Sequence, residues 1–476
     1  MRISQILKDV PIKDKNFTKD LDINHLSCNP TESQDGGMFF NLRASQDYAI
    51  KAFENGANCM VVEKPIDINV PQIIVPNARK AMSYASASFY NYNPEDFTII
   101  GVTGTNGKTT TTHLVHQLLT KMGQKSALIG TEGVYLGDKI LPAKLTTPDP
   151  IDLFSLFQKC RQSGINNIVM EVSAHASALE KIAPIKYDAM MITNITQDHL
   201  DFFKTMDAYA EQKYRLLSPK SCKRAIVNID DSTLKQKFST LGNHKIGIGK
   251  SRLADYQIML EDMSMQGSSA TILHGGKDYT MHTNLIGEYN VYNLVSALSI
   301  CAELGYSMED MQKVVNNTKF VVPGRMQVVP LRNGANAVID YAHTPDGVYQ
   351  FLTTLKKTNP YGKLIGVFGC GGNRDRDKRH KMGAIASELC DYVVVTSDNP
   401  RNESPELIVK DIVSGIKSTN FEQIIDRKDA IHQAINHARA GDVVAIFGKG
   451  AERTQEINGV KYPMNDFDTV NETIVR

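Results

Sequence analysis

Short, continuous apolar runs separated by longer amphipathic stretches dominate the chain after residue 95. Between residues 95 and 230 the runs occupy 97–103, 168–172, 189–193 and 225–228. A second series begins after Val322-Pro323-Gly324 and occupies 337–341, 364–369, 392–396 and 442–447. Runs of this length that alternate with helical stretches are typical of parallel strands buried on both faces. The pattern therefore predicts two successive parallel α/β sheets.

The remaining segments complete a prediction of three domains. Within residues 1–95, short apolar runs at 38–40 and 59–62 flank a helical stretch at 46–55. In residues 255–283, apolar and polar positions alternate between Gly-rich turns, a pattern that favours antiparallel strands. A chain of 476 residues fits about three domains. We expect an α/β protein with a small N-terminal α/β domain (1–95), a central P-loop-type parallel-sheet ATPase domain (96–322) and a C-terminal Rossmann-like domain (323–476).

Composition narrows the class of protein. Lys and Arg number 53 against 52 Asp and Glu, so no global charge draws the chain to nucleic acid or an anionic membrane. The seven cysteines are scattered without a CxxC pair, which argues against a disulfide framework or a structural zinc site. The N-terminus lacks a signal-peptide pattern, and no run approaches the roughly 20 apolar residues of a membrane span. We expect a cytoplasmic enzyme that neither binds nucleic acid nor enters a membrane.

A Gly-rich turn follows the first strand of the central domain and opens a helix. The turn and first helical residues are Gly104, Thr105, Asn106, Gly107, Lys108, Thr109 and Thr110. Glycines let backbone N–H groups approach phosphate oxygens, and the helix N-terminus adds its dipole. The lysine suits β- and γ-phosphates and the threonine hydroxyl suits Mg²⁺. Val102 stands where a full Walker A motif has glycine, and a tight turn capped by threonine is the structural alternative.

Three further polar residues follow strand ends in the same domain. Glu171 ends an apolar strand, where a carboxylate is costly to bury unless it is paired or ligates a metal. His199 follows the next strand, and Lys213 lies on a predicted helix at 208–217. Ligands gather at the carboxyl edge of such sheets, so these residues together with the phosphate loop predict a Mg²⁺-nucleotide site.

These motifs resemble the Mur ligase family, the ATP-dependent amide-forming enzymes of cell-wall precursor assembly. The matching segments are 101–109, Thr146-Thr147-Pro148, 171–175, 194–201, 287–293, 323–326 and 340–346, in the order of the family. The resemblance implies an acid–amino-acid ligase that forms an acyl-phosphate on UDP-MurNAc-L-Ala-D-Glu and joins it to an amino acid, most closely as in members that add meso-diaminopimelate. It implies ATP and two Mg²⁺ ions as cofactors, and we expect a monomer.

The resemblance also assigns roles. Lys108, Glu171, His199 and Lys213 would be catalytic, with Thr109 and Glu171 holding one Mg²⁺, and His199 and carbamylated Lys213 serving the second. The remaining nucleotide contacts would come from Asn290, Asn293, Arg325, Asp340 and His343. The carrier would be bound by Thr146, Thr147, Ser173 and Lys181.

Residues of the predicted third domain would determine which amino acid is added. Asp398, Asn399, Pro400 and Arg401 follow a buried strand, and a guanidinium there can clasp a carboxylate with two hydrogen bonds. meso-Diaminopimelate has a distal carboxylate that lysine lacks, so an unpaired arginine would penalise lysine. Gly448 and Glu452 resemble residues that bind the distal end of the amino acid, and Arg374 resembles a third contact. A surface ion pair is the alternative for Arg401.

The N-terminal domain departs from the family pattern. Asn29-Pro30-Thr31 replaces the usual Asp-Ser-Arg segment there. In the central domain, beyond Glu171, Leu179 and Lys181 stand at positions usually held by Gln and Arg. Three alternatives therefore stay open: a paralogous Mur-type ligase that adds L-lysine or another amino acid to a related carrier, an enzyme similar to folylpolyglutamate synthase, or a non-catalytic nucleotide-binding regulator.

Overall fold

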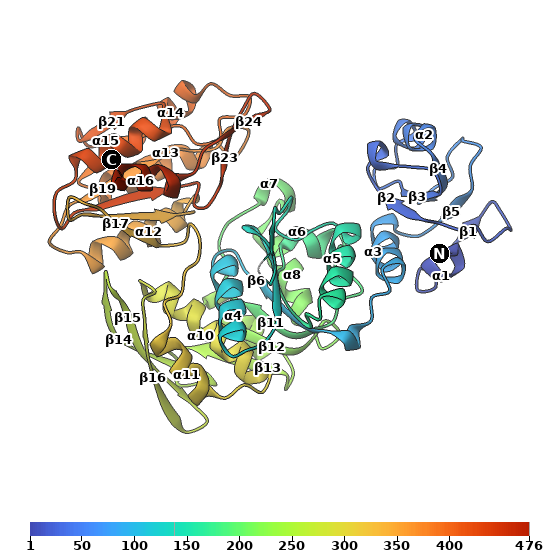
Figure 1. The fold of residues 1–476 in the computed structure, drawn as a ribbon, viewed down its shortest axis with the longest axis horizontal. Helices are drawn as coiled ribbons and strands as arrows, with labels where there is room; N and C mark the ends of the chain where they lie inside the picture. The colour runs from blue at the N-terminus through green and yellow to red at the C-terminus, as the bar shows by residue number, and fades with distance from the viewer. Residues whose placement is uncertain (138, 476) are drawn as a thin grey trace. The chain divides into compact units, whose positions relative to one another are not determined.

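The computed structural model describes residues 1–137 and 139–475 of the chain (Figure 1). These residues form two compact units. The first unit contains residues 1–108, 119–247 and 303–305. The second contains residues 109–118 and 248–302 and the chain from Tyr306 onward. Within the described residues, no helix has the length and apolar character that crossing a membrane requires.

A five-stranded sheet at the start of the first unit has the order β1-β5-β4-β3-β2, parallel except for β1. Its strands are β1 (Asp14–Lys15), β2 (His25–Ser27), β3 (Gly37–Phe40), β4 (Ala57–Val62) and β5 (Gln72–Ile74), and its helices are α1 (Ile3–Ile6), α2 (Gln46–Glu54) and α3 (Ala78–Phe89). Buried side chains alternate between the two faces: Met38 and Phe40 pack on one side, and Phe39 on the other. The predicted strands at 38–40 and 59–62 and the helix between them are confirmed.

The second sheet of the first unit carries the phosphate loop. From β13 onward the order of its strands is β13-β12-β11-β6-β10-β7-β8-β9, with parallel pairing from β12 through β7 and antiparallel pairing at β8 and β9. The strands are β6 (Thr98–Thr103), β7 (Ser126–Gly130), β8 (Gly133–Leu136), β9 (Lys139–Leu141), β10 (Asn167–Glu171), β11 (Tyr187–Ile192), β12 (Cys222–Asn228) and β13 (Lys245–Gly249). The helices of this region are α4 (Lys108–Lys121), α5 (Pro150–Gln162), α6 (Ala174–Ala178), α7 (Leu200–Phe203), α8 (Met206–Tyr214) and α9 (Ser232–Ser239). The four predicted strands are confirmed, and β7 was missed because its apolar run is only Ala127-Leu128-Ile129.

The second unit begins with an antiparallel ladder and two helices. The ladder joins β14 (Tyr256–Ser264), β15 (Gly267–His274) and β16 (Lys277–Thr283), which confirms the predicted antiparallel strands. The helices are α10 (Glu288–Glu303) and α11 (Met308–Asn317).

The C-terminal sheet has the order β17-β18-β22-β19-β20-β21 and is parallel except for β17. Its strands are β17 (Gln327–Pro330), β18 (Asn336–Asp340), β19 (Leu364–Phe368), β20 (Tyr392–Val395), β21 (Phe421–Gln423) and β22 (Val443–Phe447), and a separate hairpin joins β23 (Thr454–Ile457) to β24 (Val460–Pro463). The helices are α12 (Pro345–Thr358), α13 (Asp377–Leu389), α14 (Pro405–Val413), α15 (Arg427–His437) and α16 (Asp466–Val475).

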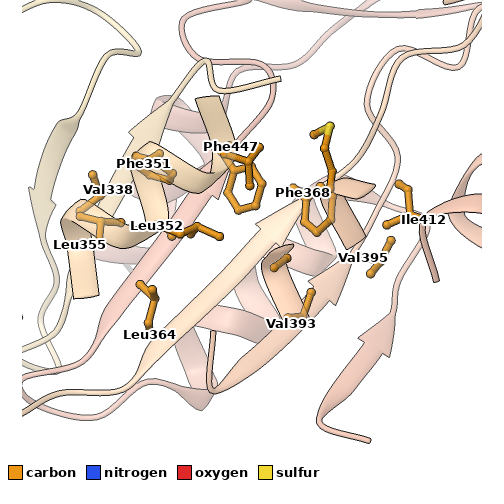
Figure 2. Packing of buried hydrophobic residues seen from close by; sticks show 14 of the residues in the cluster. Val338, Phe351, Leu352, Leu355, Leu364, Phe368, Val393, Val395, Ile412 and Phe447 are labelled. Atoms are coloured by element: carbon orange, nitrogen blue, oxygen red, sulfur yellow. The ribbon is translucent and has the colours of Figure 1, made fainter. Parts of the chain in front are cut away.

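Alternate residues of these strands pack into two hydrophobic cores, one on each face of the sheet. On the face covered by α12, α13 and α14, Phe368 stacks on Phe447 with ring centroids 4.7 Å apart (Figure 2). On the opposite face, Val367 and Ile446 pack with residues of α15 and α16. Burial on both faces explains why each strand is a continuous apolar run. The α/β fold class is confirmed, and the domain boundaries at residues 95 and 322 stay predictions.

Candidate active site

The phosphate loop takes its shape from the end of the neighbouring strand. Gly104 has φ +140°, and a Cβ there would lie 1.9 Å from the Thr193 hydroxyl oxygen, so only glycine fits. The Thr193 hydroxyl donates to the Asn106 carbonyl at 2.6 Å, and the Asn106 N–H donates to the Asn194 side chain at 2.9 Å. Strand β11 therefore sets the conformation of the loop that leaves β6.

Two lysine side chains meet at this loop. Lys108 Nζ donates to the carbonyls of Gly104 and Thr105 at 3.0 and 2.7 Å. Lys213, on α8, is 1% exposed, and its Nζ also donates to the Gly104 carbonyl. Burial lowers the pKa of Lys213 well below its ordinary value; Lys108 lowers it further, and Asp198 opposes the shift. The fold thus favours a neutral amine at Lys213.

His199 lies beside these lysines. It stands before α7 in the left-handed region with φ 54°, and its Nε2 lies 3.3 Å from the Asp198 carboxylate. Burial lowers the pKa of His199; Asp198 opposes the shift, whereas Lys108 and Lys213 reinforce it. A neutral imidazole keeps a lone pair for a ligand. Its ring is 4.9 Å from that of His175.

Glu171 ends β10 with no exposed surface. The Thr131 N–H donates to Glu171 Oε1 at 2.8 Å, and the Thr131 hydroxyl donates to Oε2 at 3.2 Å. A Cβ on Gly130 would lie 2.4 Å from Oε1, so the glycine makes room for the carboxylate. Sequence reasoning missed Thr131 because it missed β7; the Gly130-Thr131 pair after that short run was the available signal.

The predicted carrier residues gather around the same strand end. The Thr147 hydroxyl donates to the Glu171 carbonyl at 2.9 Å and lies 3.3 Å from the Ser173 hydroxyl. The hydroxyls of Thr146 and Thr131 lie 3.0 Å apart. Lys181, at 9% exposure, pairs with Asp149 at 2.8 Å in the segment that follows these threonines. The tertiary structure therefore brings four residues from two distant sequence segments together.

The asparagines predicted to contact the nucleotide are buried in the second unit. Asn293 Nδ2 donates to Asn290 Oδ1 at 3.2 Å, and Asn290 Nδ2 donates to the Ile286 carbonyl at 2.9 Å. The Thr111 hydroxyl donates to Asn293 Oδ1 at 3.3 Å. The neighbouring Thr110 is also buried. These contacts fix α10 to the segment of α4 in the second unit, and the contacts of both asparagines with the nucleotide stay predictions.

Arg325 joins several other predicted residues in the second unit. Its Nη2 donates to the Thr109 hydroxyl at 3.3 Å, and its guanidinium lies over the Tyr341 ring, 4.2 Å from the centroid. Asp340 accepts backbone N–H bonds from Met326 and Ala342 at 2.7 and 2.8 Å. Burial raises the pKa of Asp340, and Arg325 opposes the shift.

His343 lies on the loop that leaves β18. Its Nδ1 is 3.0 Å from the Tyr341 carbonyl oxygen, and its own carbonyl accepts a bond from Lys378 at 2.9 Å. The loop is therefore tied to the start of α13.

The predicted amino-acid residues converge at the carboxyl edge of the C-terminal sheet. Asn399 Nδ2 donates to Glu452 Oε2 at 2.8 Å, and fully buried Lys449 donates to the same oxygen at 2.8 Å. A Cβ on Gly448 would lie 3.1 Å from the Asp398 carboxylate. Sequence reasoning missed Lys449 as part of this network, although it stands between two residues that were singled out.

Arg401 and Arg374 flank one glycine at this edge. A Cβ on Gly371 would lie 3.0 Å from Arg401 Nη1 and 3.7 Å from Arg374 Cγ. Arg401 Nη1 donates to the Gly372 carbonyl at 2.7 Å, and its Nε is 3.5 Å from Glu456 Oε2. Arg374 is exposed. Glu456, on β23, was not anticipated from the sequence.

The oxygen donors of Glu171 and Thr109 are of the types that bind a hard divalent cation. No group of three or more His, Cys, Asp or Glu side chains is assembled for a metal within residues 1–137 and 139–475. Glu171 supplies a buried carboxylate and Thr109 a hydroxyl, and oxygen ligands of this kind suit Mg²⁺. Glu171, His199 and Lys213 belong to the first unit, whereas Thr109 belongs to the second.

Comparisons with known proteins agree with these observations. The Mur ligase middle domain matches residues 102–301, and the Mur ligase glutamate ligase domain matches residues 324–450. A UDP-N-acetylmuramoyl-L-alanyl-D-glutamate--2,6-diaminopimelate ligase from Aquifex aeolicus is 40% identical over 95% of this chain and 94% of its own length. A ligase of the same description from Clostridium acetobutylicum is 37% identical over 100% and 99%. A solved structure of such a ligase matches with a TM-score of 0.71 at 30% identity, over 100% of this chain and 99% of its own.

Proposed function

The chain belongs to the Mur ligase family, and from this premise we propose that it is an ATP-dependent ligase that adds meso-diaminopimelate to UDP-MurNAc-L-Ala-D-Glu. The reaction first transfers the γ-phosphoryl group of ATP to the D-Glu carboxylate. The amine of diaminopimelate then attacks the resulting acyl-phosphate, the tetrahedral intermediate collapses, and phosphate leaves. The products are the tripeptide carrier, ADP and phosphate.

The phosphate loop of the first unit supports the phosphoryl-transfer half. Lys108 lies at the N-terminus of α4, where its charge and the helix dipole both favour the triphosphate. Backbone N–H groups of the loop that Gly104 shapes would hold the phosphate oxygens. Bound Mg²⁺ would offset negative charge on the transferring phosphoryl oxygens, and the carboxylate of Glu171 and the hydroxyl of Thr109 are each of the oxygen-donor type that suits it.

Lys213 is proposed to act as a carbamate. The carbamate forms when a neutral amine adds to CO₂, so a lysine held as an ammonium could not form it. Burial and the nearby Lys108 lower the pKa of Lys213, which favours the neutral amine. The new N–C bond forms as the amine nitrogen releases one proton to solvent, so the product is an anion with two oxygens, and together with His199 it would suit a second Mg²⁺.

The observation that carries the choice of amino acid is the arrangement around Arg401. Its guanidinium is fixed by the Gly372 carbonyl and by Glu456, beside Arg374. Guanidinium groups bind carboxylates through paired N–H bonds, and meso-diaminopimelate offers a distal carboxylate where lysine has none. Glu452 and Asn399 lie close by and can accept or donate hydrogen bonds to the distal amine and carboxylate.

The decisive experiment measures phosphate release by the purified protein with ATP, Mg²⁺ and UDP-MurNAc-L-Ala-D-Glu. We expect release that depends on meso-diaminopimelate, with much less when L-lysine replaces it. Equal rates with the two amino acids would refute the assignment to Arg401. Release that depends instead on a folate and glutamate would favour the alternative related to folylpolyglutamate synthase, and no release with any acceptor would favour a regulator.

A further inference from the structure

A buried ion pair lies under the two loops that carry Arg374 and Arg401. The Arg379 side chain, on α13, is 1% exposed and donates two bonds to Glu403, from Nη2 to Oε1 at 3.0 Å and from Nη1 to Oε2 at 3.1 Å. The Glu403 side chain is 13% exposed, and bonds from Arg379 lower its pKa to about 2. Parallel bonds of this kind fix the relative orientation of the two groups.

Each member of the pair also holds the backbone of the loop that carries Arg374 (residues 371–376, the first loop); the loop that carries Arg401 (residues 399–404) is the second. Arg379 Nη2 donates to the Gly371 carbonyl at 3.3 Å, and the Asn373 N–H donates to Glu403 Oε1 at 2.5 Å. The pair therefore fixes the residues on both sides of Gly372, immediately before Arg374. Arg376, from the same loop, adds a bond to Glu403 Oε2 at 2.9 Å.

The first loop is joined to the second at three points. The Gly372 N–H donates to the Asn399 carbonyl at 2.9 Å, Arg401 Nη1 donates to the Gly372 carbonyl at 2.7 Å, and the Asn402 N–H donates to Asn373 Oδ1 at 3.1 Å. The approach is close, since a Cβ on Gly372 would lie 1.9 Å from the carbonyl oxygen of the residue before Arg401.

Two residues in this junction have an unfavourable backbone conformation. Asn373 and Arg401 have φ values of 52° and 51°, a region that non-glycine residues occupy only when surrounding contacts hold them there. Glu403 supplies one of those contacts directly to Asn373. Loss of this contact would let the loops take other conformations and would release the guanidinium of Arg401 from its position.

We propose that Arg379 and Glu403 are positioning residues that hold the two loops together, so that Arg374 and Arg401 are already in place when the amino acid binds. This inference rests on the proposed function, because it assigns these arginines to the distal carboxylate of diaminopimelate. Neither residue of the pair touches the reacting atoms. Because the pair holds the loops in place beforehand, it lowers the entropic cost of ordering them when the amino acid binds.

If the pair only stabilised the fold, loss of either carboxylate partner of Arg379 would have a similar effect. Asp411, the other partner, therefore provides the matched control. Asp411 accepts a bond from Arg379 Nη1 at 2.9 Å, its side chain is 48% exposed, and it lies on α14 away from both loops. Asp411→Asn removes a carboxylate partner of Arg379 and leaves Glu403 intact. Glu403→Gln removes the charge that holds Asn373 and keeps the size of the side chain.

The test compares both variants with the parent protein by steady-state phosphate release. We expect Glu403→Gln to raise the KM for meso-diaminopimelate by about tenfold or more, the effect of losing charged hydrogen bonds. Its KM for ATP should stay within about twofold, since the phosphate loop is untouched. Asp411→Asn should resemble the parent. An unchanged KM for diaminopimelate in Glu403→Gln, or an equal rise in Asp411→Asn, would overturn the proposal.

Hydrogen exchange of the same three proteins separates this inference from the proposed function. Peptides that cover residues 371–376 and 399–404 should exchange faster in Glu403→Gln than in the parent. Their exchange rates in Asp411→Asn should equal those of the parent. Equal exchange in all three proteins refutes the positioning role, whatever the enzyme's substrate. If the loops loosen as expected but the parent shows no release dependent on diaminopimelate, the pair holds the loops and the proposed substrate is wrong.

Discussion

The phosphate loop and the amino-acid loops both follow the carboxyl ends of parallel strands, yet they arrange charge in opposite ways. At the phosphate loop, Lys108 and Lys213 donate to the same Gly104 carbonyl, and burial together with the cation of Lys108 lowers the pKa of Lys213. At the amino-acid loops, each buried cation lies against a carboxylate, as Lys449 does against Glu452.

The difference matches the ligands that the two regions are proposed to receive. A triphosphate brings several negative charges, so the cation of Lys108 gains most of its favourable electrostatic energy on binding. A zwitterionic amino acid brings both signs, and recognition depends on where each charge lies. Ion pairs within the protein fix those positions beforehand. The first region is therefore expected to respond to loss of charge, and the second to loss of geometry.

The largest effect is expected from Lys108→Ala. Removing the cation of the phosphate loop should lower phosphate release about 10³-fold, because the charge acts where negative charge develops. Lys121→Ala, at the exposed end of the same helix, is the matched control. The measurement is a coupled phosphate assay at saturating substrates. A loss of less than tenfold would contradict a role for Lys108 at the transferring phosphoryl group.

The next largest effect concerns stability of the amino-acid region. Arg427 and Asp466 form a fully buried pair at 2.7 and 2.8 Å, and Arg427 also donates to the Phe447 carbonyl at 3.1 Å. Asp466→Asn should lower the free energy of unfolding by about 3 kcal/mol because it leaves a buried charge poorly compensated. Urea denaturation followed by circular dichroism measures this. Asp468→Asn, exposed on the same helix, should change little; an equal loss there would argue against a specific effect of burial.

Arg401→Ala tests the geometry directly. It should lower kcat/KM for meso-diaminopimelate about 10²-fold, the order expected when a charged pair with the substrate is lost. Activity with L-lysine should not fall, because lysine has no distal carboxylate for Arg401 to bind, and the affinity for ATP should stay near that of the parent. Initial rates with each amino acid and a nucleotide-binding titration supply the comparison. Loss of ATP affinity would show that Arg401 acts elsewhere.

The smallest effect is a pH dependence that follows from Lys213. Its pKa is lowered in the folded protein, so the neutral amine is lost, and with it the proposed carbamate, as pH falls through the folded pKa. The unfolded chain binds this proton at higher pH, so the contribution of Lys213 to stability also falls as pH is lowered. We expect kcat to decline on the acid side by up to about tenfold per pH unit.

Intact-mass measurement across the same pH series checks the cause. The mass of one added CO₂ should be present at high pH, decline together with kcat, and be absent from Lys213→Ala. An acid decline in kcat without any such adduct would assign the titration to another group, with His199 as the first candidate because its pKa is also lowered.

Much of this molecule could be read from local sequence patterns. The strand runs, the Gly104–Lys108 turn and the order of polar residues at strand ends depend on periodicity and on the φ preferences of glycine, which are local properties. The helix expected at 208–217 is likewise present, as α8 followed by a single 3-10 turn at Arg215–Leu217.

Long-range partners could not be predicted in the same way. Thr131 reaches Glu171 across 40 positions, Lys213 reaches Gly104 across 109, and Glu456 reaches Arg401 across 55 residues. No pattern within either segment specifies the other. Asn290 and Asn293 were predicted to contact the nucleotide, and the structure adds a hydrogen bond between them that this prediction did not include.

The capacity to bind phosphate, metal and carboxylate belongs to the side chains and their neighbours in the chain, so it can be recognised in the sequence. Which of these residues share an environment depends on the folding of distant segments against one another. Burial lowers the pKa of Lys213 and the Arg379–Glu403 pair joins two loops, and both effects arise when distant segments exclude water together.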